Sequence, residues 1–239
     1  MPARAIFFDF DDTLHDFTGS FRHAFAAGAT AVCPGVGPAG TDQLREACRE
    51  PWDELWQAFV TGGLDEDALW AGRAREVLER CGRAAEPELI QLFRDHYTRA
   101  MLGSLRLFPD ASGALELARG ARPVPILAIL TNGPRSVQRQ RLQHLGLDRL
   151  TSFQLISGEL GVAKPQRAYF ARALELAAVP ARDAVMIGDN PATDIAGARD
   201  TGLHAVWLNR AGLPWPGPGE PPPEAPSVLA AVRWALDTV

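Results

Sequence analysis

Two acids, Asp9 and Asp11, follow the first apolar run of the chain, in the segment DFDDTL at residues 9–14. Because they are two residues apart, an extended backbone projects both carboxylates to the same side. Like charges held this close repel, so they persist only with a bound cation or a shared proton. The pair predicts an oxygen site for a hard divalent cation, with one carboxylate as nucleophile and the other as proton carrier. An acidic turn after a strand is the alternative for this segment alone.

Two further polar segments suit the binding of phosphate. Thr131, Asn132 and Gly133 supply a hydroxyl, an amide and a glycine that lets backbone N–H groups approach an anion. For these three residues alone, a capping turn before the next helix is an equal alternative. Lys164 precedes Pro165, which suits the first turn of a helix, so we expect the lysine beside a helix N-terminus, where anions bind.

A fourth segment, GDNPATD at residues 188–194, follows the apolar run 184–187. Asp189 leaves the end of its strand as Asp9 does, and we expect it to complete the metal site. Asp194 either supports that site or only favours the N-terminus of the helix that follows.

Lysine is nearly absent from this chain: Lys164 is the single lysine, and the other 23 of the 24 basic residues are arginine. A compact ammonium on a flexible stem and a planar guanidinium are not interchangeable at every site. The retained lysine therefore indicates a position that needs a point charge. Its survival by chance is the alternative.

Alternating strands and helices must position these segments. Strands are predicted at 4–9, 125–130, 153–157, 184–187 and 205–208, and helices near 110–120, 134–145, 165–178 and 194–201. This alternation predicts an α/β fold, with a Rossmann-like parallel sheet, right-handed crossovers and helices on both faces. Such sheets bind their ligands at the carboxyl ends of the strands, where the four segments lie.

An all-helical stretch interrupts this pattern, with helices predicted at 16–32, 42–60, 65–81 and 86–101. Since the first strand belongs with the later ones, we expect an α/β core of residues 1–14 and 105–239 and an inserted helical cap of residues 15–104. Residues 211–226 hold seven prolines and are expected to run extended to a last helix near 227–238. A proline-rich ligand for another domain is the alternative for this stretch.

The four segments together resemble the four motifs of the haloacid dehalogenase-like hydrolase superfamily, and the resemblance covers nearly the whole chain. The stretches 131–147 and 194–209 are similar to the branch that contains pyrimidine 5'-nucleotidases and N-acylneuraminate-9-phosphatases. The resemblance implies a Mg²⁺-dependent phosphatase of a small phosphomonoester, either a nucleotide or a sugar phosphate.

The resemblance also implies a role for each residue. Asp9 would form an aspartyl-phosphate, and Asp11 would protonate the leaving group and then activate water. Thr131, Asn132 and Lys164 would hold the phosphoryl group. The Mg²⁺ ligands would be Asp9, Asp11 through its main-chain carbonyl, and Asp189, with Asp194 in support.

Residue content separates the branches of this superfamily. Dehalogenating members lack the second acid, so Asp11 favours phosphate chemistry. The phosphonate-cleaving branch needs a cap lysine for a Schiff base, and residues 15–104 contain none. A phosphosugar mutase, which shares both acids, and a non-catalytic phosphometabolite-binding protein remain as alternatives.

Substrate specificity is expected to come from the cap. Trp52, Trp56 and Phe59 have helical spacing and suit stacking on a base or sugar, although the inner face of a helical bundle is the favoured alternative. Arg22 and His23 either contact the distal group of a substrate or lie on a solvated helix face.

Composition narrows the range of partners. With 46% hydrophobic and 22% charged residues, the 239-residue chain is globular, and its net charge of -5 argues against nucleic-acid polymers and membranes. A small phosphorylated metabolite remains compatible with that charge.

The N-terminal apolar run is too short for a signal peptide. Three cysteines without Cys-x-x-Cys spacing predict neither a disulfide nor a zinc site, so we expect a cytoplasmic location.

Overall fold

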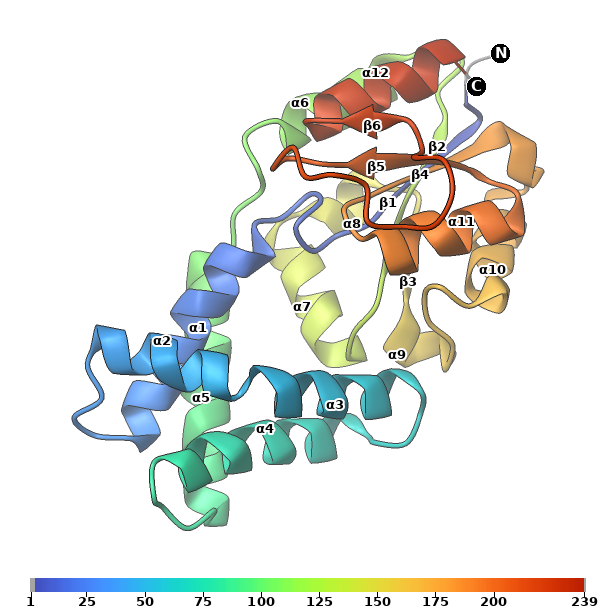
Figure 1. The fold of residues 1–239 in the computed structure, drawn as a ribbon. Coiled ribbons are helices and arrows are strands. Elements are labelled where there is room, and N and C mark those ends of the chain that lie inside the picture. The colour runs from blue at the N-terminus through green and yellow to red at the C-terminus, as the bar shows by residue number, and fades with distance from the viewer. Residues whose placement is uncertain (1–2, 239) are drawn as a thin grey trace. The chain divides into compact units, whose positions relative to one another are not determined.

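The computed structural model describes residues 3–238, and the chain forms two compact units. One unit combines the residues up to Asp16 with those from Arg106 onward, and the other is Phe17–Leu105. A parallel sheet forms the centre of the first unit, whereas the described residues of the second are helices and loops (Figure 1). We call the second the helical unit; its role as a cap stays a prediction. Among the described residues, no helix is long and apolar enough to cross a membrane.

The sheet has six strands in the order β3-β2-β1-β4-β5-β6, and every neighbouring pair is parallel. The strands are β1 (Ala5–Phe8), β2 (Ile126–Thr131), β3 (Phe153–Ile156), β4 (Ala184–Gly188), β5 (His204–Leu208) and β6 (Glu224–Ala225). Phe8 lies opposite Ile129 on one side and Ile187 on the other, so the three central strands end nearly level. The predicted fold class is confirmed.

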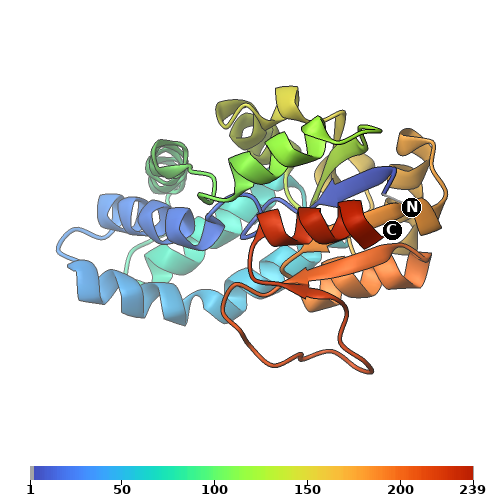
Figure 2. The ribbon, with the colours of Figure 1, turned by 90° about the horizontal axis from the view of Figure 1, so that it is seen from above.

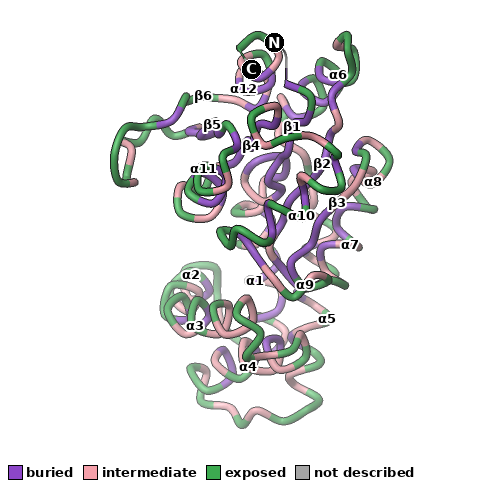
Figure 3. Tube along the Cα trace, turned by 90° about the vertical axis from the view of Figure 1, so that its right-hand side faces the viewer, coloured by how far each residue is buried: buried purple, intermediate pink, exposed green. Residues whose placement is uncertain are grey.

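Helices cover both faces of this sheet because side chains alternate along each strand. Ile6 and Phe8 of β1 face one core, shared with α6 (Ala111–Gly120), α7 (Arg135–His144) and α12 (Val228–Thr238). Phe7 faces the other, shared with α10 (Arg167–Ala177) and α11 (Ala196–Thr201). Two short helices, α8 (Leu147–Leu150) and α9 (Ser157–Leu160), flank β3. Figure 2 shows α6 and α12 side by side, and Figure 3 shows the strands buried between the layers.

Strand β6 was not predicted. It lies within the proline-rich stretch 211–226, which was expected only to run extended to the last helix. Backbone hydrogen bonds tie this stretch to β5: Trp207 N–H donates to Pro223 O over 2.9 Å, and Asn209 N–H to Ala225 O over 2.9 Å. Two residues of parallel pairing give no periodic pattern that sequence reasoning can detect.

The helical unit contains five helices in its described residues. These are α1 (Phe17–Val32), α2 (Pro38–Ala47), α3 (Arg49–Val60), α4 (Glu66–Arg80) and α5 (Pro87–Ser104). The single helix predicted at 42–60 is wrong: the chain forms α2 and α3, separated at Cys48. Helix α2 also begins earlier, at Pro38, a residue that suits the first turn. Helices α1 and α5 pack closely at Gly28, where a Cβ would lie 2.8 Å from the Phe93 ring.

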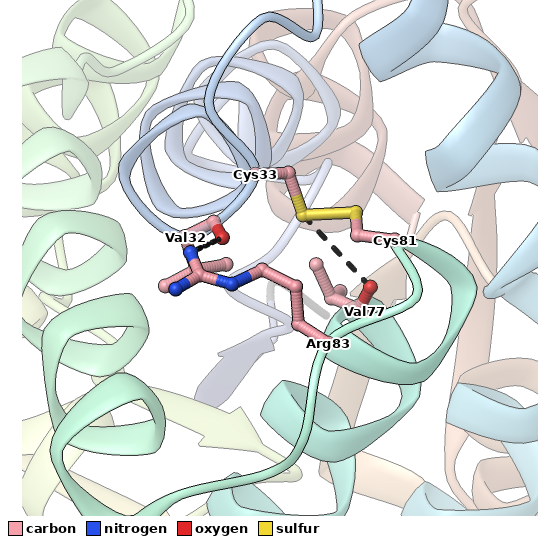
Figure 4. Close-up of a disulfide and its surroundings, with 5 residues drawn as sticks. All are labelled: Val32, Cys33, Val77, Cys81 and Arg83. Atoms are coloured by element: carbon pink, nitrogen blue, oxygen red, sulfur yellow. Dashed lines mark hydrogen bonds between the residues drawn. A yellow bond between two sulfur atoms is a disulfide. The ribbon is translucent and has the colours of Figure 1, made fainter.

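A disulfide joins Cys33, just after α1, to Cys81, just after α4 (Figure 4). The prediction that this chain has no disulfide is wrong. The two cysteines are 48 positions apart, and only the packing of the helices brings their Cα atoms to 6.0 Å. Beside them Arg83 donates a hydrogen bond to Val32 O. The cysteine count therefore no longer supports a reducing, cytoplasmic location.

We expect loss of this disulfide to destabilise the helical unit. Closing a loop of 48 residues stabilises a folded chain by about 4 kcal/mol on the chain-entropy scale. The double variant Cys33→Ser, Cys81→Ser should therefore melt at a lower temperature than the wild type, as measured by thermal unfolding without reductant. Cys48→Ser is the matched control, because Cys48 is a free, buried thiol. Equal melting temperatures for the double variant and the wild type would contradict a stabilising role.

Candidate active site

Three carboxylates meet at the carboxyl ends of the central strands. Asp9 follows β1, Asp189 follows β4, and Asp194 lies in the π-helical turn Pro191–Ile195. One oxygen of each lies within 4.8 Å of the other two. Asp9 and Asp194 are only 7% and 1% exposed. The structure thus brings together three of the predicted site residues.

Lys164 reaches the same place from the loop before α10. Its Nζ lies 2.5 Å from Oδ1 of Asp9 and 2.7 Å from Oδ1 of Asp194, and the residue is 3% exposed. The prediction that a helix starts at Pro165 is wrong, because α10 begins at Arg167. The lysine is therefore positioned by a turn with a cis Lys164–Pro165 bond rather than by the first turn of a helix.

The side chain of Asn132 holds the Lys164 backbone. Its Nδ2 donates to Lys164 O, and its Oδ1 accepts from Lys164 N–H, both over 2.9 Å. Asn132 thus positions the lysine, a role that the sequence did not reveal, and its binding of phosphate stays a prediction. Thr131, at the end of β2, is 1% exposed, and its hydroxyl accepts a hydrogen bond from Gln138 over 2.6 Å.

Asp11 has different neighbours. Its carboxylate is not among the three grouped carboxylates of the described chain. Both of its oxygens accept hydrogen bonds from the guanidinium of Arg141, with Nη1 3.2 Å from Oδ2. Metal binding through the main-chain carbonyl of Asp11 stays a prediction, and Arg141 is a partner that sequence reasoning missed.

The three grouped carboxylates face a single ammonium ion. Burial is the main cause that raises the pKa of Asp9 to about 7 and the pKa of Asp189 to about 8. Burial alone would lower the pKa of Lys164, but Asp194 and Asp9 together raise it above its ordinary value. When all three acids are ionised, two negative charges remain uncompensated by the lysine. A divalent cation would balance them, and an all-oxygen donor set suits Mg²⁺, so these residues fit that ion.

Small and polar neighbours hold the acids in place. A Cβ on Gly188 would lie 2.4 Å from Oδ2 of Asp194, so only glycine leaves room for that carboxylate. The buried hydroxyl of Thr13 donates to Oδ1 of Asp189 over 3.4 Å, and Trp207 Nε1 donates to Asp189 O over 3.0 Å. Thr13 and Gly188 lie inside segments that the sequence singled out, but nothing in the sequence indicated these contacts.

The aromatic residues of the helical unit are in part structural. Trp52 is 4% exposed, packs against Phe25 at a centroid distance of 5.3 Å, and donates from Nε1 to Arg73 O. The packing alternative therefore holds for Trp52. Trp56 and Phe59 are partly exposed, and Arg22 and His23 are exposed on α1.

A match over most of the chain identifies the family of this protein. Haloacid dehalogenase-like hydrolases match residues 3–202. The chain belongs to this family, as the four motifs predicted. Its phosphatase and nucleotidase relatives confirm the predicted class of enzyme, a hydrolase of phosphoric monoesters.

Individual relatives of this chain are named for different phosphorylated substrates. A phosphoserine phosphatase from Thermus thermophilus is 39% identical over 183 residues, which are 70% of this chain and 71% of the relative. The pyrimidine 5'-nucleotidase YjjG from Escherichia coli is 33% identical and covers 85% of both chains. Human N-acylneuraminate-9-phosphatase is 27% identical over 88% of this chain and 84% of its own.

Solved structures share the fold. The magnesium-bound HAD-hydrolase YfnB from Bacillus subtilis superposes with a TM-score of 0.77 at 23% identity, covering 100% of both chains. A 2-haloacid dehalogenase from Pseudomonas syringae gives a TM-score of 0.70 at 28% identity, covering 97% of this chain and 99% of the other. A dehalogenase thus shares this fold with a chain whose relatives are phosphatases, so the fold alone does not distinguish the two reactions.

Proposed function

We propose that this chain is a Mg²⁺-dependent phosphatase that hydrolyses a small phosphomonoester through an aspartyl-phosphate at Asp9. The observation that carries the proposal is the buried Asp9 carboxylate, held 2.5 Å from the only lysine of the chain beside two further acids. A dehalogenase is disfavoured because a second acid, Asp11, stands two residues after Asp9.

Each residue then has a chemical task. An oxygen of Asp9 attacks phosphorus while the bond to the leaving oxygen breaks, and Asp11 gives its proton to that oxygen. Asp11 then takes a proton from water, whose oxygen displaces Asp9 and releases inorganic phosphate. Lys164 offsets the repulsion between the attacking carboxylate and the phosphoryl oxygens, and Thr131 binds one of those oxygens.

The proposed metal site consists of Asp9, the main-chain carbonyl of Asp11, and Asp189, with Asp194 in support. When bound there, Mg²⁺ would offset the negative charge of the phosphoryl oxygens, and Asp9, Asp189 and the Asp11 carbonyl would hold it. The substrate class stays a nucleotide, a sugar phosphate or a similar small metabolite, since relatives are named for phosphoserine, pyrimidine nucleotides and N-acylneuraminate 9-phosphate.

Release of inorganic phosphate tests this proposal. The purified protein should be assayed with Mg²⁺ on an aryl phosphate and on a panel that includes phosphoserine, nucleoside monophosphates and sugar phosphates. Phosphate release supports a phosphatase. An isomeric sugar phosphate without phosphate release would identify a mutase, and binding without turnover of any ester, aryl phosphate included, would identify a binding protein.

We expect the metal site to bind Mg²⁺ in the absence of substrate. Titration calorimetry on the EDTA-treated protein should show one Mg²⁺ site, and EDTA should abolish phosphate release until Mg²⁺ is restored. Asp189→Asn should weaken Mg²⁺ binding, because it removes an anionic ligand. Asp42→Asn is the control, since Asp42 lies on the surface in an ion pair with Arg45. Full activity after exhaustive chelation, or equal Mg²⁺ affinity in Asp189→Asn, would contradict the site.

A further inference from the structure

Arg141, on α7, is a buried cation whose carboxylate partner is Asp11. The residue is only 3% exposed, and it is 130 positions from Asp11 in the chain. Nη1 and Nη2 each contact a different oxygen of Asp11, and the guanidinium carbon lies 4.8 Å from the centre of the Phe10 ring. A two-point contact between a planar guanidinium and a carboxylate fixes the plane of the carboxylate as well as its position.

Gln138 joins this pair to Thr131. It precedes Arg141 by three residues, so both side chains lie on the same face of α7. Its Oε1 accepts from Arg141 Nη1 over 2.6 Å, and its Nε2 donates to Thr131 Oγ1 over 2.6 Å. Nε2 also lies 3.3 Å from Oδ2 of Asp11. One helix face therefore contacts two residues of the site.

The backbone leaves room for this network. Gly133 has φ +149°, and a Cβ at that position would lie 2.9 Å from Cγ of Gln138. The lack of a Cβ at Gly133 thus lets the loop after β2 lie against the Gln138 side chain on α7. Beyond residues 131–133, the sequence indicated only a similarity of the stretch 131–147 to one branch of the superfamily, whereas the geometry gives Gln138 and Arg141 contacts within the site.

We propose that Arg141 and Gln138 are positioning residues for Asp11, which they orient for proton transfer to the leaving oxygen. This inference rests on the proposed phosphatase function, in which Asp11 is the acid. Proton transfer needs a donor within hydrogen-bond distance and correctly directed, and a positioned acid contributes about 10²–10⁴-fold. A carboxylate released from Arg141 turns about its own side-chain bonds, and much of that factor is lost.

The test compares two leaving groups. The p-nitrophenolate ion leaves without a proton, whereas the alkoxide of an alkyl phosphate, such as glycerol 1-phosphate, needs one. We expect Arg141→Lys and Gln138→Met to lower kcat/KM for the alkyl ester at least tenfold more than kcat/KM for p-nitrophenyl phosphate. In the Asp11→Asn background the same substitutions should have little further effect on the alkyl ester, because the acid they position is already gone.

Arg139→Lys is the matched control. Arg139 lies on the same helix and makes its own two-point contact, to Glu159, away from Asp11. It should leave the ratio between the two esters as in the wild type, and melting temperatures check that each variant is folded. Equal losses on both esters in folded Arg141→Lys and Gln138→Met would overturn the positioning role. A wild type that hydrolyses no ester of the full panel would instead refute the proposed function.

Discussion

Asp9→Asn is expected to lower phosphate release by more than about a thousandfold while the protein stays folded. Asparagine keeps the shape of the side chain but has neither the charge nor the nucleophilic oxygen that the proposed mechanism needs. Quenching the wild type during turnover and mapping it by mass spectrometry should locate a phosphoryl group on Asp9. The asparagine variant should carry none.

Asp183→Asn provides the control for this experiment. Asp183 precedes β4, at the opposite end of the strand from Asp189, and pairs with Arg4 on the surface. Its substitution should leave phosphate release near the wild-type rate. If Asp9→Asn retained activity within tenfold of the wild type, the covalent mechanism would be wrong.

Lys164→Arg is expected to lower kcat/KM by about a hundredfold or more, although it keeps the charge. The ammonium group lies within 2.7 Å of two carboxylates in a site with almost no solvent exposure. A guanidinium is larger and planar, so it would displace those carboxylates or lose contact with one of them. The measurement is kcat/KM on the best ester from the panel.

A matched control exchanges the same two residue types elsewhere. Arg172→Lys, on the exposed surface of α10, should have no effect on kcat/KM. Normal kinetics in Lys164→Arg would show that the single lysine survives by chance. An amine reagent is a poor probe of Lys164, because the residue is buried and the neighbouring carboxylates raise its pKa, which keeps the amine protonated.

Local sequence patterns predicted five of the six strands and the proximity of Asp9 to Asp189 for one reason. Asp9 and Asp189 each follow a short, fully buried apolar strand, and parallel strands bring their carboxyl ends to the same edge. Two short patterns, far apart in the sequence, were therefore enough to place two acids side by side. The composition of the chain singled out Lys164, because a single lysine among 24 basic residues can be recognised without any structure.

The remaining features depend on packing between distant segments. The contact of Arg141 with Asp11 joins a helix face to a strand end. The residues next to each of them in the sequence do not indicate this pairing. The pairing of Cys33 with Cys81 depends on where α1 and α4 end. The break at Cys48 is different, because Pro51, in the first turn of α3, marks a helix start in the local sequence, and the prediction of one continuous helix overlooked it.

Strand β6 forms one edge of the sheet. Its short length and the prolines beside it affect how easily a strand of another molecule can pair with that edge. A sheet edge presents unpaired N–H and C=O groups on which a strand from another chain can dock. Here the outermost strand is only two residues long, and prolines at 221–223 and 226 surround it. Proline has no N–H to offer, so a second chain would find few donors along this edge. The proline-rich stretch thus disfavours edge-to-edge aggregation at the β6 edge of the sheet.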